Sequence, residues 1–481
     1  MQFVLGPRSP DGFEAWQRFE ISDSLHLLAH PELHVDQAGN VGVSATLIGY
    51  VLDPRDPRAG NVDILNKLIS HVSQDGDLFE ALAPLGGRWA LIFNDGQRLK
   101  LVGDATGLRQ IFHSDVAQTN ELWCASQPNH MATVLGIQPA PEAQEFIEWF
   151  QAHSPESWWP GDSSPYRELK RLLPNHYLDL ATGQPHRFWP RTSLPVRPLK
   201  DAVGGISEIL AGMMQSAAKR FDLAVAMSAG WDSRLMLAAS RSIARDIAYY
   251  TAKRPDMAWT HMDIHIPTRL LTKLKLRHDI IEHSTEASPE FTAAYNNNVP
   301  FAHGNRLAPL QSELNYYKRT KVGVTGNVSE VARCFYPRPD APGHAVTAED
   351  LTAVTDMDHP FARARFSAWL KDLGDPLNYN ILDLFYWEQR AGSWFAHNCL
   401  EFDMAWQDIF IPFNSRGLLK DMLSVDECDR QGPQYELYRQ LMLKLWPAVL
   451  SQPINPTHSR KGMRRILSAI RRRLRSVFRQ D

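Results

Sequence analysis

The stretch Leu223-Ala-Val-Ala-Met-Ser-Ala-Gly-Trp-Asp-Ser-Arg234 decides the expected fold of the second half of this 481-residue chain. Its first five residues are a continuous apolar run, which is typical of a strand buried on both faces. The residues from Arg234 to Ser240 are good helix formers. A strand, a small-residue loop and a helix start together predict an anion site, because the first N–H groups of a helix have no internal partner.

The side chains of this loop indicate a nucleotide polyphosphate rather than a single phosphate. Ser228 and Ser233 offer hydroxyl donors, and Gly230 lets the backbone approach a ligand closely. The Asp232 carboxylate would repel a phosphate directly. Its place in the loop is explained if Mg²⁺ lies between this carboxylate and the phosphates. The loop therefore predicts an ATP and Mg²⁺ site. The alternative is a serine-rich turn without a ligand.

The loop resembles the Ser-Gly-Gly-x-Asp-Ser signature of the PP-loop ATP pyrophosphatases, with Ala229 in place of the first glycine. Enzymes of that superfamily split ATP between the α and β phosphates. They leave AMP on a substrate oxygen and hold pyrophosphate on the loop. Met227 and Thr251, expected at the ends of adjacent strands, suit contacts with adenine.

The first half of the chain reads as short strands with turns. Residues 89–93 and 98–102 predict a hairpin around Asn-Asp-Gly, and residues 62–72 have apolar residues at helical spacing. Residues 40–49 are β-rich. Residues 151–200 hold many prolines and aromatic residues, which predicts a packed connection between domains rather than a flexible linker.

The order of motifs in this half resembles the glutaminase domain of asparagine synthetases. Leu85-Gly-Gly-Arg-Trp-Ala-Leu-Ile-Phe93 is followed by Gly103-Asp-Ala-Thr-Gly-Leu-Arg-Gln-Ile-Phe112. The resemblance implies an α+β, Ntn-hydrolase-like β-sandwich followed by an α/β domain with a parallel sheet. We place the degenerate glutaminase-like domain at 1–190, the synthetase domain at 191–459 and a basic amphipathic tail at 460–481.

The chain departs from that family at its start. The family's glutaminase uses an N-terminal cysteine, whose thiolate attacks the glutamine amide. Position 2 is Gln2 here, and no cysteine precedes Cys124. We therefore expect no glutaminase activity, and an amine that comes from a substrate.

A second loop of the synthetase half resembles the family's Ser-Gly-Glu-Gly-Ser-Asp-Glu segment. It begins at Thr325-Gly326 and reaches Glu330, which falls on an acid of that segment. The resemblance implies that Glu330 binds Mg²⁺ together with Asp232. Asn327 stands where asparagine synthetases have Glu and β-lactam synthetases have Tyr, and an amide cannot accept a proton at neutral pH.

Two later motifs supply the remaining candidate catalytic residues. Trp406-Gln-Asp408-Ile-Phe-Ile-Pro-Phe-Asn414 resembles the family's Ser-Val-Glu-x-Arg-Val-Pro-Phe-Leu-Asp, which makes Asp408 the candidate general base. Glu388 and Arg390 are the alternatives. Lys461 matches the family lysine that neutralises transition-state charge.

His261 and His265 have the i, i+4 spacing of metal ligands. No Glu follows the first His as zincins require, so we predict no metal there.

Composition limits the broad class of the protein. Apolar content of 44% with 22% charged residues is that of a folded globular protein of two or three domains. The four cysteines have no CxxC spacing, and no signal peptide or membrane span is visible, so we expect a cytoplasmic protein.

Net charge is −3, but residues 460–481 hold nine basic residues and one acidic residue. This tail is expected to pack its apolar stripe on the protein, with weak contact to anionic lipid or to an acidic peptide as the alternative.

These features together predict an ATP-dependent amide-forming ligase that adenylates a small-molecule or peptide carboxylate. We expect ring closure, as in the related β-lactam synthetases and lasso-peptide cyclases, with a precursor peptide and its leader-binding or protease proteins as candidate partners. No nucleic acid is expected. The alternatives are an asparagine synthetase that uses ammonia or glutamine, another type of PP-loop enzyme, and a non-catalytic binding module of the same fold.

Overall fold

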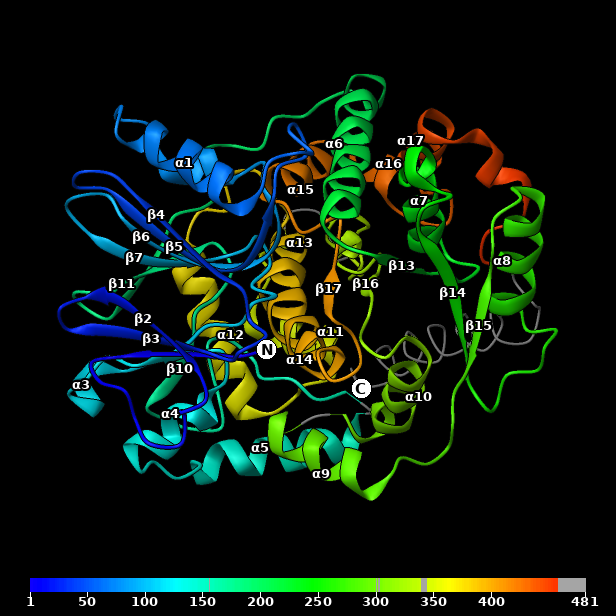
Figure 1. Ribbon diagram of the computed structural model, residues 1–481. Helices are drawn as coiled ribbons and strands as arrows, with labels where there is room; N and C mark the ends of the chain where they lie inside the picture. Colours follow the sequence, from blue (N-terminus) through cyan, green and yellow to red (C-terminus); the bar gives the residue numbers. More distant parts are fainter. Residues whose placement is uncertain (155, 300, 302, 339–343, 457–481) are drawn as a thin grey trace, which may run out of the picture.

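The computed structural model describes residues 1–154, 156–299, 301, 303–338 and 344–456. It places two antiparallel six-stranded sheets on one side of the molecule and a parallel sheet on the other (Figure 1). The first antiparallel sheet has the order β10-β8-β9-β1-β3-β2. Its strands, in chain order, are β1 (Phe3–Gly6), β2 (Gln17–Ser22), β3 (Leu25–Ala29), β8 (Phe112–Ser114), β9 (Cys124–Ala125) and β10 (Leu169–Arg171).

The second antiparallel sheet has the order β12-β11-β7-β6-β5-β4. Its strands are β4 (Val35–Gly39), β5 (Ser44–Leu52), β6 (Gly86–Asn94), β7 (Leu99–Gly103), β11 (His176–Asp179) and β12 (Gln184–Arg187). Both sheets bury alternate side chains against each other in one apolar core, which makes them a β-sandwich.

Helices cover the outer faces of this sandwich. α1 (Asn61–Val72) and α2 (Leu78–Leu82) pack on the second sheet, and α4 (Pro128–Leu135) packs on the first. The N-terminal domain is therefore an α+β sandwich with a helix layer on each side. α3 (Val116–Thr119) is a further short helix of this domain, whereas α5 (Pro141–His153) buries Phe146, Ile147 and Phe150 in the core of the second half.

Two predictions for this half are confirmed, and two are corrected. β6 and β7 form the predicted hairpin, and α1 matches the predicted helix. In the 40–49 stretch, the strand begins only at Ser44 and continues to Leu52. Residues 151–200 are more than a connection, because β10, β11 and β12 lie in this stretch and pair within the two sheets. Large side chains of residues 151–200, such as Trp158 and Phe188, are buried as expected.

The second half is built on a parallel sheet of order β15-β14-β13-β16-β17. Its strands are β13 (Leu223–Ala226), β14 (Ala248–Lys253), β15 (Asp279–Glu282), β16 (Val322–Val324) and β17 (Asp408–Phe410). The chain moves outward from β13 to β15 and then returns to pair β16 with the other side of β13. The loops after β13 and β16 therefore meet at the carboxyl edge, where open α/β sheets bind ligands.

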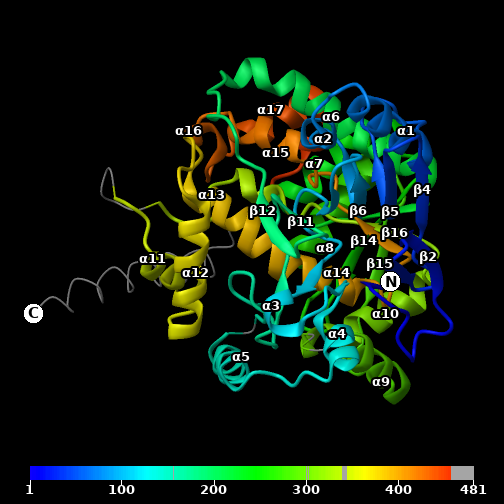
Figure 2. The same cartoon turned by 90° about the vertical axis from the view of Figure 1, so that its left-hand side faces the viewer.

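Helices connect these strands, as expected for an α/β domain. α6 (Leu199–Arg220) leads into β13, α7 (Trp231–Ala239) joins β13 to β14, and α8 (Met262–Lys273) joins β14 to β15. α9 (Pro289–Asn298) and α10 (Leu307–Tyr317) precede β16. α5 and α9 lie at the same end of the molecule in both views (Figure 1 and Figure 2).

The segment between β16 and β17 is helical, and more helices follow β17. They are α11 (Ala348–Thr355), α12 (Pro360–Leu373), α13 (Ile381–Phe385), a π-helix (Tyr386–Phe395), α14 (Ala396–Phe402), α15 (Arg416–Leu423), α16 (Glu427–Arg430) and α17 (Glu436–Leu445). Short 3₁₀ turns occupy Arg241–Ile243, Gly304–Arg306, Ser329–Ala332 and Pro447–Ser451. Among the described residues, no helix is both long and apolar enough to cross a membrane.

Candidate functional site

The loop that follows β13 is closed by its own serine hydroxyls. Ser233 Oγ lies 3.1 Å from both the backbone N–H and the hydroxyl of Ser228, and the N–H of Gly230 donates to Ser228 Oγ at 3.1 Å. Gly230 is the N-cap of α7. The loop thus folds as a compact turn at the helix start, as the sequence predicts.

A carboxylate from α8 also holds this loop. Asp263 Oδ1 accepts the N–H of Ala229 at 2.9 Å. This contact depends on how α8 packs beside β14, so local sequence patterns do not indicate it.

The loop after β16 contacts the first loop directly at Asp232. A Cβ atom added at Gly326 would lie 2.6 Å from the Asp232 Cβ, so only glycine fits there without a shift. Ser329 donates its hydroxyl to Asp232 Oδ1 at 2.5 Å. The structure therefore brings together Asp232 and the predicted second loop.

Arg333 lies between the two carboxylates that were predicted to bind Mg²⁺. Its Nη2 atom is 3.2 Å from Asp232 Oδ2 and 3.2 Å from Glu330 Oε1. The guanidinium also lies over the rings of Tyr435 and Tyr438, at 5.6 and 5.7 Å from their centroids. We call Asp232, Glu330 and Arg333 the loop cluster.

Burial dominates the electrostatics of the loop cluster. It raises the pKa of Asp232, and the nearby Arg333 charge only partly opposes this shift. Burial, helped by the Asp232 charge, raises the pKa of Glu330 to about 7. One guanidinium does not fully compensate two desolvated carboxylates, so this cluster favours additional positive charge.

The second loop stores backbone strain beside the cluster. Val328 has φ of 76°, a left-handed conformation that is unfavourable for a β-branched side chain. The asparagine synthetase motif has glycine at this position. The strain lies one residue before Ser329, which contacts Asp232.

Met227, directly after β13, lies beside Thr251, which is inside β14 and not at its end. Thr251 donates its hydroxyl to the Met227 carbonyl at 2.9 Å, and His278 Nε2 lies 2.9 Å from the same hydroxyl. Burial lowers the pKa of His278 to about 4, so the ring is neutral at physiological pH. The geometry confirms that the two residues are adjacent, while their contact with adenine stays a prediction.

The end of the described chain packs against the same loop. Arg234, which is fully buried, donates to the carbonyls of Val449, Gln452 and Pro453 at 2.7 to 3.1 Å. The N–H of Asn455 donates to the Ala229 carbonyl at 2.9 Å. Lys461 and the basic tail lie outside the described residues.

The structure does not bring Asp408 to the loop cluster. Asp408 pairs in register with Val322, the first residue of β16, whereas the second loop follows the last residue of that strand. Asp408 is therefore at the opposite, amino edge of the parallel sheet. Its position gives no support to the predicted role as general base.

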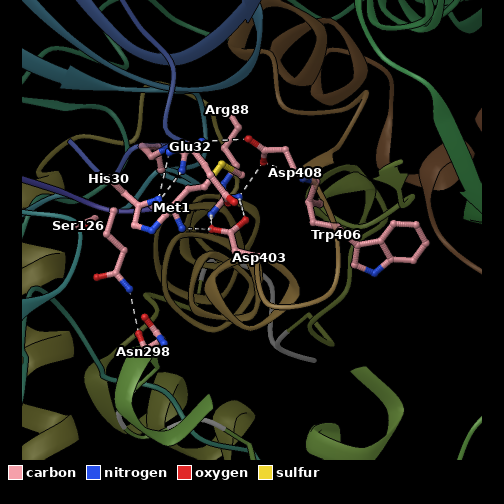
Figure 3. Close-up of polar contacts among 12 residues, drawn as sticks. Met1, His30, Glu32, Arg88, Ser126, Asn298, Asp403, Trp406 and Asp408 are labelled. Atoms are coloured by element: carbon pink, nitrogen blue, oxygen red, sulfur yellow. Dashed lines mark hydrogen bonds and ion pairs between the residues drawn. The ribbon is translucent and has the colours of Figure 1, made fainter. Parts of the chain in front are cut away.

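Asp408 instead takes part in ion pairs between the two domains. Arg88 Nη1 lies 2.8 Å from Asp408 Oδ1 (Figure 3). Arg109 Nη2 lies 3.2 Å from Asp408 Oδ2. Arg88 also contacts both oxygens of Asp403, at 2.6 and 3.0 Å. We call Arg88, Arg109, Asp403 and Asp408 the interface cluster. Burial alone would raise the pKa of Asp403, but the charge and hydrogen bonds of Arg88, together with the charges of the Met1 ammonium and Arg109, outweigh it, and the pKa falls to about 2.

The two alternatives to Asp408 also have structural partners. Glu388 is fully buried and pairs with Arg187, at 2.7 Å, while Trp369 donates to its carboxylate. Burial would raise the pKa of Glu388, but the charge and hydrogen bonds of Arg187, together with His176 and Asn175, lower it. Arg390, in the π-helix, pairs with Glu156 through both terminal nitrogens.

The region around Gln2 offers no thiol nucleophile. The Gln2 amide donates to the Asn298 carbonyl at 2.9 Å, and its oxygen faces His130. Cys124 lies in β9, where it pairs with Leu5 and is fully buried. Burial raises the pKa of the Cys124 thiol, so it has the environment of an unreactive cysteine.

Comparisons with known proteins add little to this geometry. No family model and no curated protein matches the sequence. Similar solved structures include a glutamine phosphoribosylpyrophosphate amidotransferase from B. subtilis, with 10% identity, coverage of 75% of this chain and 73% of that chain, and a TM-score of 0.23. The NH3-dependent NAD synthetase from Campylobacter jejuni has 15% identity, coverage of 39% and 96%, and a TM-score of 0.20. The NAD+ synthetase from Burkholderia pseudomallei has 13% identity, coverage of 53% and 90%, and a TM-score of 0.18. These TM-scores are too low to carry an argument.

Proposed function

We propose that this chain is an ATP-dependent synthetase of the asparagine synthetase type, which forms a carbon–nitrogen bond. It would activate a substrate carboxylate as an acyl-adenylate, with release of pyrophosphate, and pass the acyl group to an amine. One observation carries the proposal. Asp232, from the loop after β13, meets the Ser329–Glu330 segment after β16 at the point where the strand order of the parallel sheet reverses.

The donor atoms at this point fit Mg²⁺. They are carboxylate and hydroxyl oxygens, which are the ligands that this ion prefers. Glu330 Oε2 and Thr325 Oγ1 are buried and have no hydrogen-bond partner. Buried polar atoms without partners are rare in native structures, so each is explained if a ligand completes the site. We assign Asp232 and Glu330 as the residues that would hold the ion, which would neutralise charge on the nucleotide phosphates.

The surrounding residues have roles that follow from their positions. Ser228, Gly230, Ser233 and Gly326 are assigned to the polyphosphate, because they form the helix start and the facing loop. Met227 and Thr251 are assigned to the adenine side. Lys461, which lies outside the described residues, is assigned to stabilise negative charge because of its match to the family lysine. Asp408 is not part of the proposed site.

The amine is proposed to belong to a substrate. Gln2 stands where a glutaminase of this family needs its cysteine, and Cys124 is buried in a strand. An amine within the same substrate would give a ring closure, such as the lactam of a lasso peptide. The partners would then be a precursor peptide and its leader-binding or protease proteins.

Pyrophosphate release tests the proposal. The protein is mixed with ATP, Mg²⁺ and a panel of amino acids and peptides that carry free carboxylates. We expect release with one class of carboxylate, and a loss of at least ~100-fold in Asp232→Asn. The matched control is Asp222→Asn, at an exposed carboxylate just before β13, which should retain activity. Undiminished release in Asp232→Asn would contradict the proposal, and no release with any carboxylate would favour the non-catalytic binding module.

The nitrogen source is tested by product analysis. With glutamine present, glutamate should not accumulate above the level in a no-enzyme control, and its accumulation would show a working glutaminase. Aspartate and ammonium should not yield asparagine. Asparagine formation would contradict ring closure and support the alternative, an asparagine synthetase.

A further inference from the structure

Arg333 is the feature of the loop cluster that neither the sequence motif nor the proposed reaction explains. The same Nη2 atom reaches both carboxylates at 3.2 Å. A single nitrogen therefore lies where a divalent cation would have to bridge Asp232 and Glu330.

Arg333 and a metal ion cannot use these oxygens at the same time. Asp232 Oδ2 and Glu330 Oε1 face the guanidinium, while Asp232 Oδ1 accepts from Ser329. A divalent cation on the same oxygens would be held close to the guanidinium, and like charges in a partly buried site repel strongly. Even an ion bound to the unpartnered Glu330 Oε2 would lie close to the guanidinium, so its entry favours displacement of Arg333.

The surroundings of Arg333 allow such a move. Its Nε atom is buried without a hydrogen-bond partner, so the guanidinium is not fully satisfied in its present position. Its stacking partners, Tyr435 and Tyr438, contact the face of the group and leave its in-plane donors free to change acceptor. Guanidinium groups bind phosphate oxygens well, because their planar donors match them in pairs.

We propose that Arg333 is a displaceable internal cation. Without nucleotide it holds Asp232 and Glu330 together, and with a metal–nucleotide complex it gives up the carboxylates and binds the polyphosphate. This inference rests on the proposed function. It predicts that metal alone binds poorly, that metal and nucleotide bind together, and that Arg333 is responsible for this coupling.

Mn²⁺ titration followed by electron paramagnetic resonance tests the inference without any turnover. Wild type and Arg333→Met are titrated with Mn²⁺ alone, and then with Mn²⁺ and the non-cleavable analogue α,β-methylene ATP. With Mn²⁺ alone, Arg333→Met should bind at least ~10-fold more tightly than wild type, because its competitor is gone. With the analogue present, the variant should lose ~10-fold or more in analogue affinity, because a phosphate ligand is gone.

Two further variants keep the test decisive. Arg439→Met, at an exposed arginine on α17, is the control for loss of a positive charge and should match wild type. Arg333→Lys retains the charge but replaces the planar fork with a point charge, and its Mn²⁺ affinity should lie between those of wild type and Arg333→Met. If Arg333→Met does not fold, the Mn²⁺ affinity of Arg333→Lys tests the inference instead.

The outcomes separate this inference from the proposed function. If wild type binds Mn²⁺ with the analogue but the Arg333 variants have unchanged affinities, Arg333 is a permanent ion pair and the inference is wrong. If the variants bind Mn²⁺ more tightly but no chain binds the analogue, Arg333 does compete with metal, and the nucleotide function is what fails.

Discussion

The loop cluster and the interface cluster both place arginines against carboxylates, yet their charge balance differs. The loop cluster has one arginine for two carboxylates, and burial raises the pKa of Glu330 to about 7. The interface cluster has two arginines for two carboxylates, with the Met1 ammonium 3.5 Å from Asp403 as a further cation, and the pKa of Asp403 falls to about 2. The first favours a further cation, whereas the second is already neutralised. Charge balance, more than the presence of acidic residues, therefore distinguishes a binding site from a structural ion-pair cluster.

Removing an arginine from the interface cluster should have the largest effect on stability. Arg88→Met would leave Asp403 and Asp408 with less compensation at a buried position, where the Arg88 side chain is 1% exposed. We expect a loss of about 3–5 kcal/mol in the free energy of unfolding, measured by urea denaturation at pH 7. The control is Arg8→Met, at an exposed pair, which should cost less than about 1 kcal/mol. A loss in Arg88→Met as small as the control's would contradict the structural role.

The pH dependence of stability should have opposite signs in the two clusters. Glu330 has a folded pKa of about 7, above its ordinary value of 4.5, so its contribution is lost as pH rises through that range. Between pH 5 and 8, wild type should lose roughly 1–3 kcal/mol relative to Glu330→Gln. Asp403 has a lowered pKa, so its contribution is present at neutral pH and is lost as pH falls from about 4 to about 2. Denaturant titrations at a series of pH values measure both contributions. If the difference in unfolding free energy between wild type and Glu330→Gln stays constant from pH 5 to 8, the predicted opposite pH dependence of the two clusters is wrong.

Separating the two loops should damage the loop cluster while leaving the interface cluster intact. In Gly326→Ala, the added Cβ would lie 2.6 Å from the Asp232 Cβ and push the loops apart. Pyrophosphate release should fall by ~10- to 100-fold, because small misplacements of reacting groups are costly. Gly205→Ala, in α6 with open space around the added atom, is the matched control. Equal rates in the two variants would show that the contact with Asp232 is unimportant.

Local patterns in the sequence predicted the frame of the site well. The apolar run before Ser228 is β13, and the good helix formers after Asp232 lie in α7. Both depend on neighbouring residues only. Gly326 and Glu330 were found through a motif, and the structure places their loop against Asp232 because β13 and β16 are adjacent.

The sequence could not predict which end of a strand a residue occupies, or what it would pair with across domains. β17 has only three residues, so the position of Asp408 at its first residue rather than its last depends on register with β16. Its partners Arg88 and Arg109 lie about 300 residues away in the chain. Arg333 was missed for a similar reason, although its i, i+3 spacing from Glu330 was a visible signal.

One comparison of variants tests the central claim, that the chemistry lies in the loop cluster and not in the interface cluster. Pyrophosphate release is measured for Asp232→Asn and Asp408→Asn, at a temperature where both are folded by circular dichroism. The account predicts that Asp232→Asn loses release by at least ~100-fold, while Asp408→Asn stays within ~10-fold of wild type. The reverse result, with Asp408→Asn inactive and Asp232→Asn active, would contradict it.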